Sequence, residues 1–97
     1  MKLAPIMLVL AAFGSMIARA AAEELAALAE ARGCLNCHAI DHREQAPSFK
    51  EIAASYASDP SAEATLIGEL KDGQGHSKVI ASDADLKALV DYVLATK

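Results

Sequence analysis

The chain has 97 residues and is poor in several residue types that commonly build or hold a protein site. It contains no tryptophan, and only Phe49, Tyr56 and Tyr92 are aromatic beyond the first 22 residues. No stretch alternates apolar and polar residues as a half-buried strand does, and no glycine-rich nucleotide-binding motif or internal repeat is present. Only two cysteines occur, so if both serve one site, none is left for a disulfide or a second site.

Residues 1–22 have the features of a secretory signal peptide. Lys2 supplies the charged start, and the apolar run that follows is shorter than the ~20 residues needed to span a membrane. Ala18-Arg19-Ala20 and Ala20-Ala21-Ala22 both offer the small-x-small pattern that signal peptidase recognises. We therefore expect export to the periplasm and a mature domain of residues 23–97. The alternative is a segment that stays uncleaved as a membrane anchor.

Basic residues are also scarce in the predicted mature chain. Loss of residues 1–22 leaves seven basic and thirteen acidic side chains, a formal charge of −6. Nucleic-acid binding normally needs a basic patch, so this composition argues against it. It favours protein partners with basic or mixed-charge docking surfaces, although an acidic surface also serves solubility alone. A single domain of this size usually needs a covalent cross-link or a bound cofactor in addition to its hydrophobic core.

One segment could provide such a covalent link. It is Cys34-Leu35-Asn36-Cys37-His38, which has the C-x-x-C-H spacing of covalent c-type haem attachment. Cys34 and Cys37 are three positions apart, so on a helical turn both thiols face one edge of a haem. His38 follows directly and can bind the iron. Zinc binding that includes His42, or a thiol redox role, remains the alternative.

Apolar periodicity predicts an all-α domain. A helix is expected over 23–32, leading through Gly33 into the cysteine motif, and a second after the capping box of Ser48 and Glu51. A third is expected to start at Asp59-Pro60 and to end at Gly73, with Leu66, Ile67 and Leu70 as its buried stripe. The last helix is expected to open with a second capping box, formed by Ser82 and Asp85. It has the strongest pattern, with apolar residues recurring at helical spacing: Leu86, Leu89, Val90, Val93 and Leu94.

Taken together, these features resemble a short bacterial class I cytochrome c over nearly the whole mature chain. The resemblance implies about four short helices wrapped around one covalent haem c, with the first and last helices packed together. It implies attachment through Cys34 and Cys37, with His38 as one axial ligand. It also implies that the carbonyl of Pro47 accepts a hydrogen bond from Nδ1 of His38, which would orient that ligand. Pro47 could otherwise simply help to start the following helix.

The chain departs from this family in lacking methionine where the second axial ligand should lie. Met1, Met7 and Met16 are the only methionines, and all belong to the predicted signal peptide. The strong-field donors left in the mature chain are His42, Lys71, His76 and Lys78. His42 lies only four residues after His38, and so short a connection cannot easily carry it round the haem to the opposite face of the iron. Lys71 is better explained as a cation that stabilises a helix C-terminus.

His76 lies between the last two expected helices, in the segment where the family carries its methionine. Gly73 and Gly75 precede it and would let the backbone approach the haem closely. We therefore expect it to bind the iron opposite His38. The alternative is a solvent-facing histidine that leaves the iron five-coordinate or water-bound.

The expected function is single-electron transfer between redox proteins, without enzymatic activity. Two histidine ligands predict a lower potential than that of His/Met relatives. The alternative is a haem protein that binds or senses CO, NO or O2 at an open or displaceable distal site. Fast uptake of carbon monoxide by the reduced protein would distinguish the second case from the first.

Overall fold

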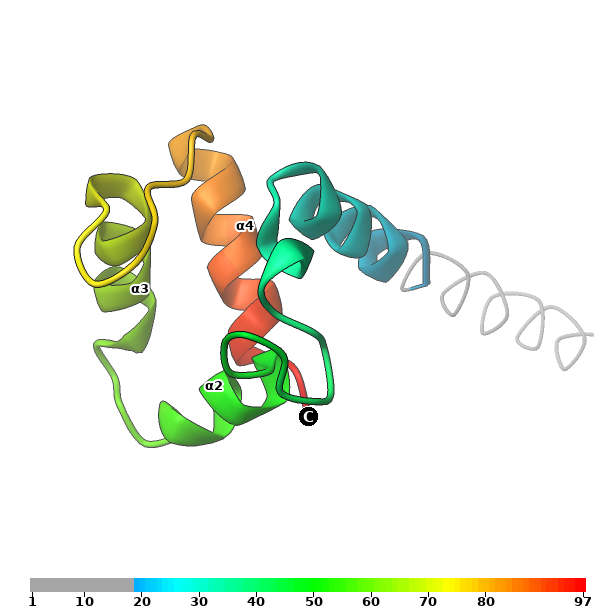
Figure 1. Cartoon of the computed structure of the whole chain (residues 1–97), viewed down its shortest axis with the longest axis horizontal. Coiled ribbons are helices and arrows are strands. Elements are labelled where there is room, and N and C mark those ends of the chain that lie inside the picture. The colour runs from blue at the N-terminus through cyan, green and yellow to red at the C-terminus, as the bar shows by residue number, and fades with distance from the viewer. Residues whose placement is uncertain (1–18) are drawn as a thin grey trace, which may run out of the picture.

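A computed structural model describes residues 19–97, and this part of the chain is helical without a strand. A helix covers 19–31, followed by a 3-10 turn, η1 (Cys34–Asn36), and by α2 (Phe49–Ser55), α3 (Ala62–Asp72) and α4 (Asp83–Leu94) (Figure 1). The all-α prediction is therefore confirmed. The predicted signal sequence lies largely outside the described residues. Within 19–97, no helix is long and apolar enough to cross a membrane.

The helix that covers 19–31, here called the N-terminal helix, extends further back than the predicted start at residue 23. Arg19 and the alanines at 20–22 are strong helix formers and continue the same turn. The helix ends before Gly33, which adopts the left-handed conformation with φ 82°. This glycine redirects the chain into η1, which begins at Cys34 and ends just before Cys37.

The predicted capping boxes are borne out to different degrees. Ser48 accepts a hydrogen bond from the backbone N–H of Glu51, and the Glu51 carboxylate accepts one from the Ser48 N–H, so α2 begins with a complete box. At α4, the Ser82 hydroxyl accepts from the Asp85 N–H at 3.1 Å. The Asp85 carboxylate pairs instead with Arg32, so α4 has only half of a box.

The predicted start of the third helix was wrong by two residues. Asp59 and Pro60 lie before α3, whose first residue is Ala62. The Asp59 carboxylate accepts from the Ser61 N–H at 2.8 Å and so stabilises a turn rather than the helix itself. The end of α3 agrees with the prediction, because Gly73 adopts the left-handed conformation with φ 72°.

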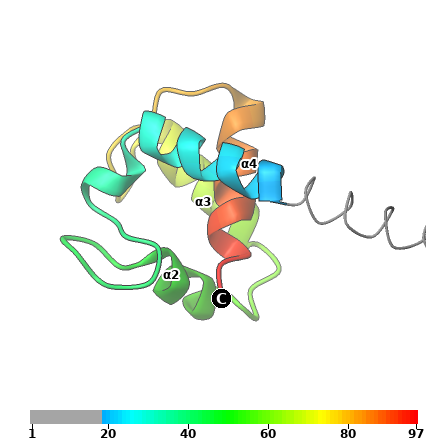
Figure 2. The same ribbon diagram turned by 90° about the vertical axis from the view of Figure 1, so that its right-hand side faces the viewer.

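The core lies between the N-terminal helix, α2 and α4, and Figure 2 shows the N-terminal helix crossing α4. Ala29, Phe49 and Leu89 form one buried cluster, and Leu28 and Tyr92 pack against it. The small Ala29 side chain lets the N-terminal helix approach α4, as the resemblance implied. α4 also packs against both α2 and α3, so it is the central element of the fold.

The apolar residues of α3 are less buried than a core helix would require. Leu66, Ile67 and Leu70 were predicted as its buried stripe, yet all three are only half-buried. Leu66 and Leu70 line a large cavity. The polypeptide thus leaves one side of α3 to be covered by something other than its own side chains.

Replacing Leu86 by alanine should destabilise the haem-loaded protein by about 2–5 kcal/mol, as expected for a large-to-small change in a packed core. Leu86 is 1% exposed in α4 and does not line the cavity, so haem absorption should stay unchanged. Denaturant unfolding followed by circular dichroism measures the change. The control is Ile80→Ala, because Ile80 is 74% exposed and should lose less than about 0.5 kcal/mol. Equal stability of the two variants would contradict this packing.

Candidate functional site

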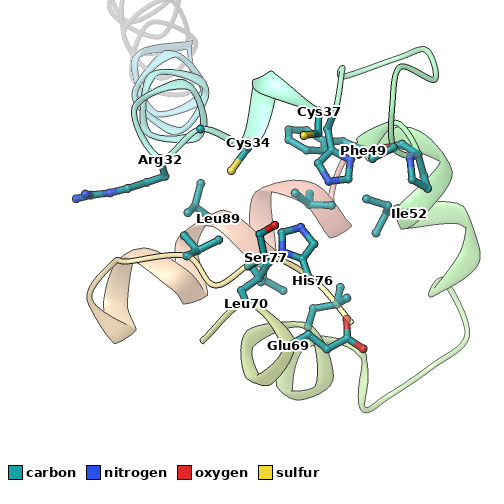
Figure 3. Close-up of a pocket in the computed structure, with 18 of the residues that line it drawn as sticks. Arg32, Cys34, Cys37, Phe49, Ile52, Glu69, Leu70, His76, Ser77 and Leu89 are labelled. Carbon is teal, nitrogen blue, oxygen red and sulfur yellow. Dashed lines mark hydrogen bonds between the residues drawn. The ribbon is translucent and has the colours of Figure 1, made fainter. Parts of the chain in front are cut away.

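The candidate site is a cavity of about 1020 Å³ between η1, α2, α3, α4 and the loop before α4 (Figure 3). This volume lies at the upper end of the ~300–1,000 Å³ range for cofactor sites. Its walls include all five residues predicted from the sequence as cofactor or metal ligands: Cys34, Cys37, His38, Pro47 and His76. The fold therefore brings together, around one space, residues that are more than forty positions apart.

The cysteine motif forms a tight turn at one wall of this cavity. The N–H groups of Cys37 and His38 both donate to the Cys34 carbonyl, at 3.3 and 3.0 Å. Both thiols are free, and Figure 3 shows them on the same side of the cavity. Burial raises the pKa of the Cys34 thiol above its usual value. A redox-active thiol needs a lowered pKa, so this environment argues against the thioredoxin-like alternative.

His38 is held from two sides. Its Nδ1 donates to the Pro47 carbonyl at 2.5 Å, and its ring lies 5.7 Å from the ring of the buried Phe49. Phe49 is fixed in turn by its backbone N–H, which donates to the Ala39 carbonyl at 2.9 Å. With Nδ1 occupied, Nε2 of His38 is the nitrogen with a free lone pair. The pattern is that of a metal-binding histidine whose second nitrogen is oriented by a backbone carbonyl.

His76 comes from the loop between α3 and α4 and points into the cavity from the side opposite the cysteines (Figure 3). Gly73 and Gly75 both have positive φ, 72° and 70°, and turn the backbone so that His76 can face inward. The Nδ1 of His76 donates to the Ser77 carbonyl at 2.6 Å. Its Nε2 is therefore also the nitrogen with a free lone pair, as in His38.

The two imidazoles are paired across the cavity. Their ring centroids are 6.0 Å apart, and their planes differ by only 3°. A ligating nitrogen lies about 2.0–2.1 Å from a bound transition metal and about 1.1 Å from its own ring centroid, so two opposed imidazoles on one ion have centroids about 6.3 Å apart. The observed separation is close to that value. The residues present thus fit one haem iron between His38 and His76.

The other donors considered from the sequence lie in different settings. His42 is exposed and bonds to Asp41 at 3.0 Å and Glu44 at 2.8 Å, and these carboxylates raise its pKa. Lys71 forms an ion pair with Asp83 at 3.0 Å. Lys78 lines the cavity and is exposed, as His76 is, so exposure does not separate these two donors.

The zinc alternative finds no support in this part of the molecule. Within residues 19–97, no group of three or more His, Cys, Asp or Glu side chains is placed to hold a metal ion. His42, the residue that kept this alternative open, bonds to two carboxylates in an exposed loop. Two protein ligands suit haem, because the porphyrin supplies the other four positions around its iron.

Sequence reasoning missed two groups that shape the site. The Ser77 carbonyl, which orients His76, carries no residue-specific signal because it belongs to the backbone. Leu66 and Leu70 were predicted as part of a buried stripe, and the sequence did not show that they form a half-buried wall of the cavity. A stripe that is apolar but poorly packed is recognisable only once its neighbours are known.

Comparisons with known proteins agree with this geometry. The family model for cytochrome c matches residues 22–97. Cytochrome c-551 of Pseudomonas aeruginosa is 36% identical over 94% of this chain and 95% of its own. Cytochrome c-552 of Nitrosomonas europaea is 36% identical over 72% of this chain and 76% of its own. The crystal structure of a deletion mutant of Nitrosomonas europaea cytochrome c552 is similar, with 37% identity, a TM-score of 0.67, and coverage of 74% and 99%.

Proposed function

Because the chain belongs to the cytochrome c family and is a class I mono-haem electron-transfer cytochrome with one covalent haem c, we propose that it is a periplasmic, low-potential carrier with two histidine ligands to iron. Cys34 and Cys37 hold the haem through thioethers. His38 and His76 bind the iron from opposite sides. The pairing of these two imidazoles, 6.0 Å apart with parallel planes, is the observation that carries the proposal.

The residues around the haem prepare both ligands for their role. The bound iron supplies a one-electron couple between Fe(III) and Fe(II). The carbonyls of Pro47 and Ser77 accept the Nδ1–H of His38 and His76, which presents each Nε2 to the metal and raises its basicity. Neither side chain provides the preference for Fe(II) that a thioether gives, so the potential should lie below that of His/Met relatives.

The partners are redox proteins, and we propose that their docking surfaces are basic or mixed in charge. Arg32, Arg43, Lys71 and Lys87 are engaged in ion pairs, so much of the positive charge of the mature chain is already neutralised. An acidic excess remains on the surface, with Glu23, Glu24 and Glu30 exposed on the N-terminal helix. The role is that of a carrier rather than an enzyme, and we propose no small-molecule substrate.

Changing His76 to alanine is expected to convert a low-spin haem into a high-spin one that takes up carbon monoxide rapidly, because the iron loses its sixth ligand. The matched control is His42→Ala, which removes an exposed histidine outside the cavity and should leave the spectrum unchanged. Visible absorption in both oxidation states measures the effect. Should the His76 variant keep the parent's low-spin spectrum, the ligand assignment is wrong and a lysine becomes the leading donor.

The parent's EPR spectrum gives a second measurement of the same assignment. The imidazole planes are only 3° apart, so both ligands donate into the same iron d orbital. This donation separates the energy of that orbital from the energy of the d orbital perpendicular to it. Parallel planes therefore predict a rhombic low-spin signal with resolved features. A single, highly anisotropic feature would mean that the two planes cross.

Export should leave a chain that begins near Ala21 or Glu23 and carries the mass of one haem. The predicted peptidase sites at Ala20 and Ala22 lie at the boundary of residues 1–22. Intact mass spectrometry of the periplasmic fraction measures both the start and the haem. A full-length product in the membrane fraction would overturn the assignment of residues 1–22 and leave the haem assignment untouched.

A further inference from the structure

The two axial histidines are held with very different strength. His38 is half-buried, is bracketed by the two cysteines' turn and by Phe49, and bonds to the carbonyl of Pro47, nine residues away. These contacts tie its ring to η1, to the start of α2 and to the loop between them. It cannot leave its place unless that part of the fold is disrupted.

His76, in contrast, is held mainly by its own loop. Every residue from 71 to 78 is exposed. The Nδ1 hydrogen bond of His76 goes to the neighbouring Ser77, so it moves with the loop and does not anchor the ring to the body of the protein. The main anchor of the segment is Val79, which is half-buried and whose N–H donates to the Leu70 carbonyl at 2.8 Å. Local opening here disrupts few buried contacts.

The cavity wall includes apolar side chains as well as charged ones. Leu66, Leu70 and Val79 line the cavity, and so do Glu69 and Lys78. Figure 3 shows Leu70 and Glu69 close to His76. The apolar part of this wall gives a small neutral molecule a surface that it can contact without losing hydrogen bonds to water.

We propose that His76 is a displaceable ligand and that neutral diatomic gases of the CO and NO class bind the reduced iron in its place. This inference rests on the proposed function, because it takes His76 as the sixth ligand. The iron–imidazole bond breaks, an iron–gas bond forms, and no electron is transferred in the exchange. Occupation by the gas stabilises Fe(II), so it would stop electron transfer while the His38 side of the fold stays intact.

The experiment mixes reduced, haem-loaded protein with increasing carbon monoxide in a stopped-flow spectrometer. The parent should take up the gas at a rate that saturates, because release of His76 becomes limiting. His76→Ala should show a rate that rises in proportion to carbon monoxide without saturation.

Two neighbouring loop variants test whether the hold on His76 sets this rate. Val79→Ala keeps the backbone N–H bond but removes part of the half-buried side chain that holds the loop, and it should raise the saturating rate several-fold. Ile80→Ala changes the next residue, which is 74% exposed, and should leave the rate unchanged. Equal rates in the two variants would overturn the role of the Val79 anchor.

The remaining outcomes separate the two proposals. No uptake by the parent, with ready uptake by His76→Ala, would overturn displacement and keep His76 as the ligand. The rate of carbon monoxide uptake could also rise without saturation and be identical in the parent and in His76→Ala. That result would show that His76 does not bind the iron, and the proposed ligation would fail.

Discussion

Replacing Cys34 and Cys37 together by serine should abolish covalent haem and almost eliminate soluble, folded protein. The mature chain has few fully buried apolar side chains, and several of them are alanines. Its cavity of about 1020 Å³ lies between all the helices that follow η1. Without a haem in that space, the side of α3 that faces the cavity has nothing to pack against, and a chain of this size has little stability to spare.

Single replacements should show the same effect in part, because one thioether can still tether the haem. Haem staining after denaturing electrophoresis, together with the yield of exported protein, measures both consequences. Leu35→Ser is the matched control, since Leu35 lies between the two cysteines, is 38% exposed and should not affect attachment. Haem that remains bound to the denatured double variant would count against the attachment site.

Much of the fold could be predicted from the sequence because its helix ends are encoded locally. Ser48 with Glu51, Ser82 and Gly73 each stabilise a helix end through groups within a few residues, and the structure places all of them as predicted. The error at α3 has the same local origin. Asp59 is a strong cap in isolation, but its carboxylate bonds to the Ser61 N–H and closes a turn before the helix begins.

The candidate site was predictable where its chemistry is concentrated in a short motif. Cys34, Cys37 and His38 are contiguous enough to be recognised by spacing alone. The size of the cavity could not be predicted, because the exposure of Leu66 and Leu70 depends on helices that are distant in sequence. The orientation of His76 was beyond reach for a related reason, since a backbone carbonyl and two positive φ angles determine it.

Changing His76 to methionine is the most direct test of what limits the potential. A thioether favours Fe(II) where an imidazole does not, so the variant should have a higher reduction potential. We expect a rise on the order of 0.1 V, a modest part of the ~0.8 V range that axial ligands span. The variant should also gain the charge-transfer absorption that marks methionine ligation, which the parent should lack.

Spectroelectrochemical titration of parent and variant measures this rise, and Leu35→Met serves as the control. That variant introduces the same side chain on the exposed turn between the cysteines, where it should change neither potential nor spectrum. A methionine at position 76 has to reach the iron from a loop turned inward by Gly73 and Gly75. If the thioether absorption appears and the potential rises, the loop before α4 still places residue 76 at the iron. An unchanged potential without that absorption would mean that residue 76 does not bind the iron. The low potential predicted for this cytochrome would then need another cause.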